Sequence, residues 1–229
     1  MNGLTDLVAD ILRKLSETGI LEEIMLIGSW CLIVYQKYFD DLPGIPVFRT
    51  TDIDFMIPYP PQIASHVDVP RVLEGLGFIE EFDVINQITK YLHRDVEIEF
   101  LIPEVGPPKD KNKHIPQLKV LPQRLRYVNI LQNNKLKSDF KGIPVIVPEP
   151  AAFVIQKLIC SAERKNPDKK ANDLRIATEF GLFLFTIPAQ VQKLYDVYQS
   201  LPVPWRKRFL RIIEAEAPKF FKEFNNINK

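Results

Sequence analysis

The sequence predicts an α+β protein in which a strand-rich domain over residues 1–148 precedes a helical domain over residues 149–229. Within residues 1–148, short apolar or alternating runs are bounded by glycine and proline, as in β-strands. After Pro148-Glu149-Pro150 the apolar residues recur at helical spacing instead. The 229 residues are 46% hydrophobic and 26% charged, a composition that suits one large or two small globular domains.

The elements follow from these patterns in order along the chain. Helical spacing predicts helices over residues 4–16, 30–39, 68–75, 151–164, 170–181, 188–200 and 204–225. Strand-like runs cover residues 23–27, 50–57, 78–85, 88–92 and 96–102, and residues 127–131 are expected to pair with 143–147 through Asn133-Asn134. The proline-rich segment 103–123 is expected to be an exposed loop.

Composition excludes several classes of function. The chain has 9 glycines and contains neither the Gly-x-Gly-x-x-Gly pattern nor a Walker A pattern, so two common nucleotide-binding loops are unsupported. A net charge of +1 provides no general attraction for nucleic acid. Cys31 and Cys160 stand alone in apolar helical patterns, which favours a reducing compartment. No signal peptide or membrane-spanning run is recognised, and a cytoplasmic location is expected.

The most informative stretch is the predicted strand that contains Asp52 and Asp54. Residues two apart in a strand point to the same side, so the two carboxylates share a face while Ile53 and Phe55 take the other. Two adjacent carboxylates repel each other unless a cation lies between them, and magnesium prefers such oxygen ligands. A solvent-exposed strand face is the alternative interpretation.

A second strand repeats this arrangement with Glu97 and Glu99, which alternate with apolar residues. A third carboxylate from a neighbouring strand would complete a site for two metal ions that performs phosphoryl transfer. These glutamates, taken alone, also fit a solvated strand face.

Gly28 and Ser29 join a predicted strand to a predicted helix. Glycine allows the backbone to approach a ligand closely, and a helix N-terminus offers free N–H groups to phosphate oxygens. Ser29 suits a phosphate contact and equally a simple helix cap.

A predicted strand leads through Gly28-Ser29 into a helix, and Asp52-Ile53-Asp54 and a later acidic strand follow. This order of motifs resembles the polymerase-beta-like nucleotidyltransferase superfamily, and the resemblance implies a mixed-sheet domain. The blocks Arg49-Thr50-Thr51-Asp52-Ile53-Asp54-Phe55 and Val96–Pro103 are similar to those of a bacterial group of uncharacterised nucleotidyltransferase-fold proteins. That resemblance implies Asp52, Asp54 and Glu99 as catalytic metal ligands, with Glu97 as second choice for the third acid.

The helical part carries a further block that is similar to the same group and, more distantly, to nucleotidyltransferase toxins of abortive-infection systems. Lys157 and Arg164 in this block are candidate ligands of a triphosphate, each as a charge partner. The alternative is a solvated helix face in which Asp173 pairs with a lysine.

The resulting hypothesis is a magnesium-dependent enzyme that moves a nucleotidyl group from a nucleoside triphosphate, such as ATP, to an acceptor hydroxyl. The acceptor, whether RNA, protein or small molecule, is left open. The alternatives are an inactive nucleotidyltransferase-fold module that binds a partner protein, and a toxin that acts on tRNA or protein and has an antitoxin-like partner.

Overall fold

The computed structural model describes residues 2–40, 45, 50–85, 87–94, 96–104 and 114–227, and within them two compact units. Unit 1 comprises the described residues of Met1–Tyr38, Phe48–Val128 and Leu136–Val147, and unit 2 those of Phe39–Val47, Asn129–Lys135 and Pro148–Lys229. The division into domains at residues 148 and 149 stays a prediction of the sequence. No helix in the described ranges has an apolar stretch long enough to cross a bilayer.

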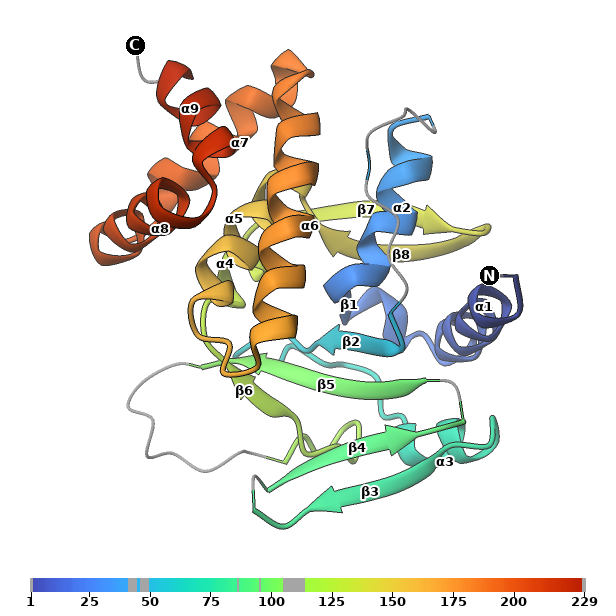
Figure 1. The fold of residues 1–229 in the computed structure, drawn as a ribbon. Helices are drawn as coiled ribbons and strands as arrows, with labels where there is room; N and C mark the ends of the chain where they lie inside the picture. The colour runs from blue at the N-terminus through green and yellow to red at the C-terminus, as the bar shows by residue number, and fades with distance from the viewer. Residues whose placement is uncertain are drawn as a thin grey trace. The chain divides into compact units, whose positions relative to one another are not determined.

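Unit 1 is built on a six-stranded mixed sheet (Figure 1). Its strands are β1 (Met25–Ile27), β2 (Asp52–Met56), β3 (Ile79–Asp83), β4 (Ile88–Leu92), β5 (Glu97–Pro103) and β6 (Gln123–Leu125). The order is β1-β2-β5-β4-β3, with β6 also paired to β5. β2 and β5 run parallel, whereas β1 with β2, β3 with β4 and β4 with β5 are antiparallel. The structure therefore confirms the mixed sheet that the resemblance implied.

Helical segments precede and connect these strands. They are α1 (Asn2–Glu17), the 3₁₀ turns η1 (Ile20–Glu22) and η2 (Gly28–Trp30), α2 (Cys31–Tyr38) and α3 (Val69–Glu74). Asp68 caps α3, because its carboxylate accepts a hydrogen bond from the backbone N–H of Arg71 at 3.2 Å. On α1 the apolar stripe predicted from the sequence is buried through Val8, Ile11 and Leu12.

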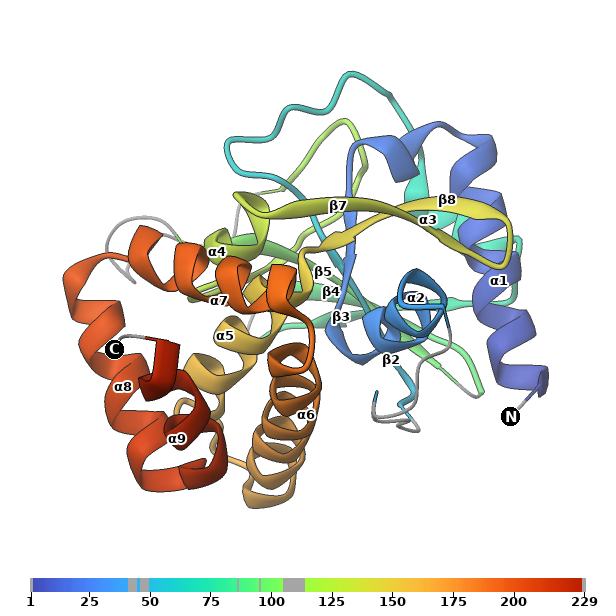
Figure 2. The ribbon, with the colours of Figure 1, turned by 90° about the horizontal axis from the view of Figure 1, so that it is seen from above.

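One pairing prediction is wrong. Residues 129–132 form the helix α4 (Asn129–Gln132), and the partner of β8 (Ile143–Pro148) is β7 (Lys135–Phe140). Figure 2 shows these two strands as the long arms of a hairpin. Lys141 and Gly142 make its turn with positive φ angles of 52° and 82°, a two-residue geometry typical of hairpins. The Asn133-Asn134 pair looked like a turn, but it ends a helix instead.

Unit 2 contains the helices α5 (Pro150–Ser161), α6 (Pro167–Phe185), α7 (Pro188–Ser200), α8 (Val203–Glu216) and α9 (Pro218–Ile227). Each begins at or next to a proline, which tolerates the first turn because its missing N–H would be unpaired there anyway. The predicted helix over 204–225 is two helices, since Pro218 interrupts it. The helix α5 is central to the unit, because it packs against α6, α7 and α8 and is buried along most of its length.

Of the loop predicted over residues 103–123, residues 105–113 lie outside the described residues. Its described part, residues 114–123, includes a bridge between Ile115 and Val120, and both side chains are buried. The strand β6 was not predicted, because three polar or mixed residues give no periodic signal.

Candidate functional site

The strands β2 and β5 bring the four predicted acidic residues together. Their parallel register pairs Asp52 with Glu97 and Asp54 with Glu99. Registered partners on neighbouring strands point to the same face, so all four carboxylates share one face of the sheet. The residues between them, such as Ile53 and Ile98, are 0% exposed, which confirms the alternation read from the sequence.

Gly28 lies directly against Asp54. Its φ angle of +74° lies in the left-handed region, and a Cβ built there would clash with Oδ2 of Asp54. Only a residue without a side chain permits this approach. The backbone of the turn η2 is thus held beside one of the carboxylates that the resemblance assigned to a metal.

The turn η2 itself differs from the predicted helix cap. Ser29 sits inside a 3₁₀ turn that starts at Gly28, and the N-cap position of that turn is Ile27. The turn is anchored by Trp30, which is 3% exposed and packs edge-on against Phe140. Ser29 is half-buried and lies within the turn instead of at its N-cap position.

Lys90 is the residue of this face that the sequence analysis missed. It lies on β4 in register with Glu99 and forms ion pairs with Glu99 and, at 2.5 Å, with Glu97. All three side chains are 20–30% exposed, so these pairs are partly screened by water. A lysine inside a predicted strand was visible in the sequence, but which strand would lie beside it was not.

The electrostatics follow from this contact. Burial raises the pKa of Glu99, and the Glu97 carboxylate adds to that effect, while the Lys90 ammonium opposes it. Burial alone would lower the pKa of Lys90, but the two glutamates outweigh burial and raise it. Lys90 therefore stays charged and acts as the counter-ion of the two glutamates.

The carboxylates of Asp52 and Asp54 are oxygen donors of the kind that Mg²⁺ binds, and the absence of a side chain at Gly28 lets the Asp54 carboxylate lie against the backbone there. These two residues therefore fit a metal. Glu99 interacts with Lys90 instead, and within the described ranges no group of three or more His, Cys, Asp or Glu side chains is arranged to hold a metal ion.

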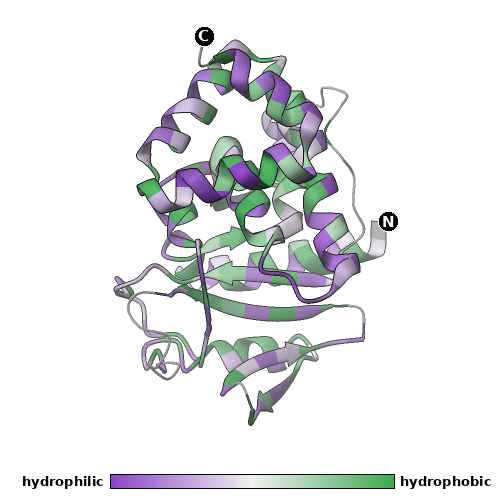
Figure 3. Ribbon diagram, turned by 60° about the vertical axis from the view of Figure 1, so that its left-hand side comes forward, coloured by the Kyte–Doolittle hydropathy of each residue, from purple (hydrophilic) through white to green (hydrophobic). Residues whose placement is uncertain are grey.

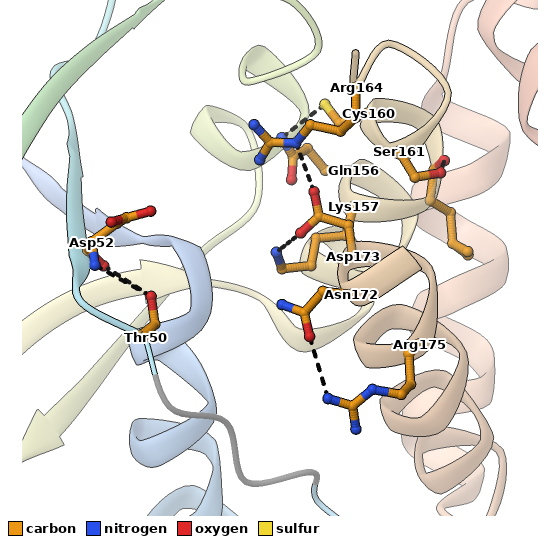
Figure 4. A network of polar contacts seen from close by, with 11 residues as sticks. Thr50, Asp52, Gln156, Lys157, Cys160, Ser161, Arg164, Asn172, Asp173 and Arg175 are labelled. Atoms are coloured by element: carbon orange, nitrogen blue, oxygen red, sulfur yellow. Dashed lines mark hydrogen bonds and ion pairs between the residues drawn. The ribbon is translucent and has the colours of Figure 1, made fainter. Parts of the chain in front are cut away.

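Asp52 forms hydrogen bonds with the two threonines that precede β2. The backbone N–H of Asp52 donates to Oγ1 of Thr50 at 3.3 Å (Figure 4). The hydroxyl of Thr51 donates to Oδ1 of Asp52 at 3.3 Å. Arg49, which belongs to the same sequence block, lies outside the described residues.

The two predicted cationic ligands lie in unit 2. Lys157 on α5 and Arg164 just beyond it both pair with Asp173 on α6 (Figure 4). Nζ of Lys157 is 2.6 Å from Oδ1, and Nε of Arg164 is 2.8 Å from Oδ2. The sequence analysis expected Asp173, if paired, to contact a lysine on a solvated face. The structure places this contact in the interior, where the Lys157 side chain is only 9% exposed.

We expect Gly28→Ala to weaken metal binding at the carboxylate face, beyond its effect on the stability of the fold. Gly142→Ala is a matched control, because Gly142 also has a positive φ (+82°) but has no atom within 4 Å of an added Cβ. Each variant should lose about 1 kcal/mol of unfolding free energy in urea from the left-handed backbone alone. Only Gly28→Ala must also displace Asp54, so only it should weaken Mn²⁺ binding. Equal Mn²⁺ affinities in the two variants would contradict the assignment of Gly28.

Comparisons with known proteins identify the family of this chain and a structure of similar fold. The model of the family described as Nucleotidyltransferase matches residues 6–186. A crystal structure of an antigenic nucleotidyltransferase-like protein from Paracoccidioides brasiliensis shares the fold, with a TM-score of 0.50 and 13% identity over 98% of this chain and 93% of that one. The solution structure of the antibiotic-resistance factor ANT(2'')-Ia is also similar, with a TM-score of 0.45 and 14% identity over 87% of this chain and 92% of that one. No curated protein gave a significant match.

The family match covers both the turn at Gly28 and the two acidic strands, as well as the first helices of unit 2. The finer resemblances to a bacterial group and to abortive-infection toxins remain predictions. The chain belongs to the Nucleotidyltransferase family.

Proposed function

We propose that the protein is a magnesium-dependent nucleotidyltransferase that moves a nucleoside monophosphate group from a nucleoside triphosphate to an acceptor hydroxyl. The observation that supports it best is the placement of Asp52 and Asp54 on one sheet face, with the bare backbone of Gly28 against Asp54. In the reaction the acceptor oxygen would attack the α-phosphorus of the nucleoside triphosphate. The bond between the α-phosphorus and the oxygen that bridges it to the β-phosphate would break, and pyrophosphate would leave. The proton of the acceptor hydroxyl would pass to solvent or to a base.

Each group has a role in this proposal. Asp52 and Asp54 would hold the metal, which when bound supplies positive charge to the phosphate oxygens. The backbone of Gly28 and the hydroxyl of Ser29 would contact the phosphates, since η2 presents them next to Asp54. Lys157 and Arg164 are proposed as further phosphate contacts. Arg164 suits this role better, because 44% of its side chain is exposed whereas Lys157 is buried.

Labelled substrate tests this function directly. The full-length protein is incubated with each of four α-³²P-labelled nucleoside triphosphates, Mg²⁺ and a cell extract. Transfer would appear as label on one macromolecule or metabolite. The same extract with the Asp54→Asn protein should gain none, and label that persists with that variant would overturn the proposal.

One specific observation favours a second candidate, an inactive module that uses the nucleotidyltransferase fold to bind a partner. Lys90 forms ion pairs with both Glu97 and Glu99, so the proposed third acid is paired with a lysine of the same sheet. Calorimetry with each nucleoside triphosphate and Mg²⁺ separates the two candidates: heat of binding supports the enzyme, and its absence supports the module.

We expect Lys90→Met to strengthen metal binding. Removing the ammonium leaves Glu97 and Glu99 without their counter-ion, so the carboxylate face becomes more negative and should bind Mn²⁺ about tenfold more tightly, equivalent to ~1.4 kcal/mol. Lys137→Met, an exposed lysine on β7, is the control and should change nothing. An Mn²⁺ affinity that is unchanged or weaker in Lys90→Met, measured by calorimetry, would show that Lys90 does not compete with the metal.

The toxin hypothesis makes a separate prediction about cells. Expression of the protein should slow growth, and the Asp52→Asn/Asp54→Asn variant should not. Rescue by co-expression of a neighbouring gene product would identify the proposed antitoxin-like partner. Equal growth with both proteins would rule out this form of the activity.

A further inference from the structure

The strand β3 forms an open edge of the sheet in unit 1. It is the last strand in the order β1-β2-β5-β4-β3, and β4 is its pairing partner (Figure 1). Among the described residues no strand pairs with its other edge. Backbone N–H and C=O groups along such an edge can pair with another extended chain.

Large apolar side chains are exposed on β3 and in the turn that follows it. Ile79 is 72% exposed, Phe82 52%, Val84 75% and Ile85 92%. They are four of the six large hydrophobic residues that the described chain exposes. Figure 3 shows hydrophobic and hydrophilic segments alternating along this part of the chain. Exposed apolar residues are ordinary when scattered, but four of them within residues 79–85, on both faces of an open edge strand and in the turn after it, indicate an interaction surface.

The negative charge of β3 favours a partner strand with basic residues. Glu80, Glu81 and Asp83 lie between the apolar residues, and β3 contains no basic residue. A second copy pairing through β3 would bring two such acidic sets together, and like charges on adjacent strands destabilise the pairing. A partner strand with basic residues would instead gain cross-strand ion pairs.

Both faces of β3 carry the same combination. Ile79, Glu81 and Asp83 share one face, and Glu80 and Phe82 share the other, because side chains alternate along a strand. An added strand would therefore meet an acid and an apolar group on each face. This matches a segment that contains both basic and apolar residues and is recognised by main-chain pairing together with side-chain contacts.

We propose that the outer edge of β3 binds an extended segment of a partner protein rich in basic and apolar residues, which adds to the sheet as a further strand. The proposal does not depend on nucleotidyl transfer. The edge strand β3 nevertheless belongs to the same sheet face as the carboxylates. One row of registered residues crosses β2, β5, β4 and β3 and consists of Asp54, Glu99, Lys90 and Glu81. With neighbouring strands ~4.8 Å apart, the bound segment would run about 19 Å from β2 on the same sheet.

A fluorescein-labelled peptide of alternating lysine and valine is the probe, titrated with the full-length protein in a fluorescence anisotropy assay. We expect saturable binding, and no binding by the matching peptide of alternating glutamate and valine. Glu81→Lys should weaken binding at least about tenfold, whereas Glu214→Lys, a charge reversal at an exposed position of α8, should not. Phe82→Ala should weaken binding as well.

Two N-methylated versions of the peptide test strand addition itself. An added strand uses the N–H groups of one edge, so methylation at alternate positions should abolish binding in one register and spare it in the other. Equal binding of both versions, equal binding of the acidic peptide, or an unchanged affinity in Glu81→Lys would overturn the proposal. So would sedimentation that shows a dimer in the wild type and a monomer in Phe82→Ala, because a second copy would then occupy the edge.

Discussion

Asp54→Asn is expected to leave the fold intact and to lower nucleotidyl transfer by at least about a hundred-fold. Asparagine keeps the shape of the side chain, but it removes the negative charge that would bind a metal beside Gly28. A metal that stabilises the charge of a phosphoryl transition state supplies several kcal/mol, and each ~1.4 kcal/mol is a factor of ten in rate. The measurement is the initial rate of label transfer under saturating nucleotide and Mg²⁺.

The controls separate a chemical effect from a structural one. Glu74→Gln removes an exposed carboxylate from α3 and should transfer label at the wild-type rate. Mn²⁺ titration of Asp54→Asn should show weakened metal binding at an unchanged melting temperature. If Asp54→Asn binds Mn²⁺ as tightly as the wild type, the carboxylate face does not hold the metal, whatever the activity.

Asp173→Ala should destabilise unit 2 by ~3–5 kcal/mol, the cost of leaving a buried charge without its partner. The Lys157 ammonium is 2.6 Å from Asp173 inside the unit, and both side chains are less than 10% exposed. Arg164 loses a partner too, but its side chain is 44% exposed, so water can solvate it. Chemical denaturation followed by circular dichroism would measure the loss.

Two further variants test the cause. Asp168→Asn, on the same helix but exposed, should cost less than about 1 kcal/mol. Lys157→Met combined with Asp173→Leu removes both charges and should recover much of the stability, because apolar replacement of a buried pair is often neutral or better. A loss below about 1 kcal/mol in Asp173→Ala would mean that Lys157 finds another acceptor.

The same ion pair predicts how stability depends on pH. Burial by itself raises the pKa of Asp173, but the charges of Lys157 and Arg164 outweigh burial and hold the pKa below its usual range. A carboxyl whose pKa is lower in the folded state stabilises the fold above its unfolded pKa, and that contribution is lost as the pH falls through the folded pKa. Acid unfolding should therefore be less steep in Lys157→Met/Asp173→Leu than in the wild type.

The strongest prediction from the sequence rests on the alternation of side chains along a β-strand. A strand turns side chains to alternate faces with a period of two, so the shared face of Asp52 and Asp54, and that of Glu97 and Glu99, followed from spacing alone. The helices of unit 2 were also predictable, since apolar spacing and helix-starting prolines are local signals. The one hairpin error arose because residues 127–131 and 135–140 are both short mixed runs, and only long-range packing selects between them.

By itself, the sequence determined the α+β class, the pairs of acids that share a strand face and the glycine that marks the turn before α2. Only the tertiary structure decided which residues these groups meet: Gly28 against Asp54, Lys90 beside Glu97 and Glu99, and Asp173 between Lys157 and Arg164. The physical reason is that sequence periodicity is a local signal, whereas these contacts join residues far apart in the chain. Periodicity fixes the face of a side chain within its own element, whereas its partner depends on strand order and helix packing, which join residues far apart in the chain.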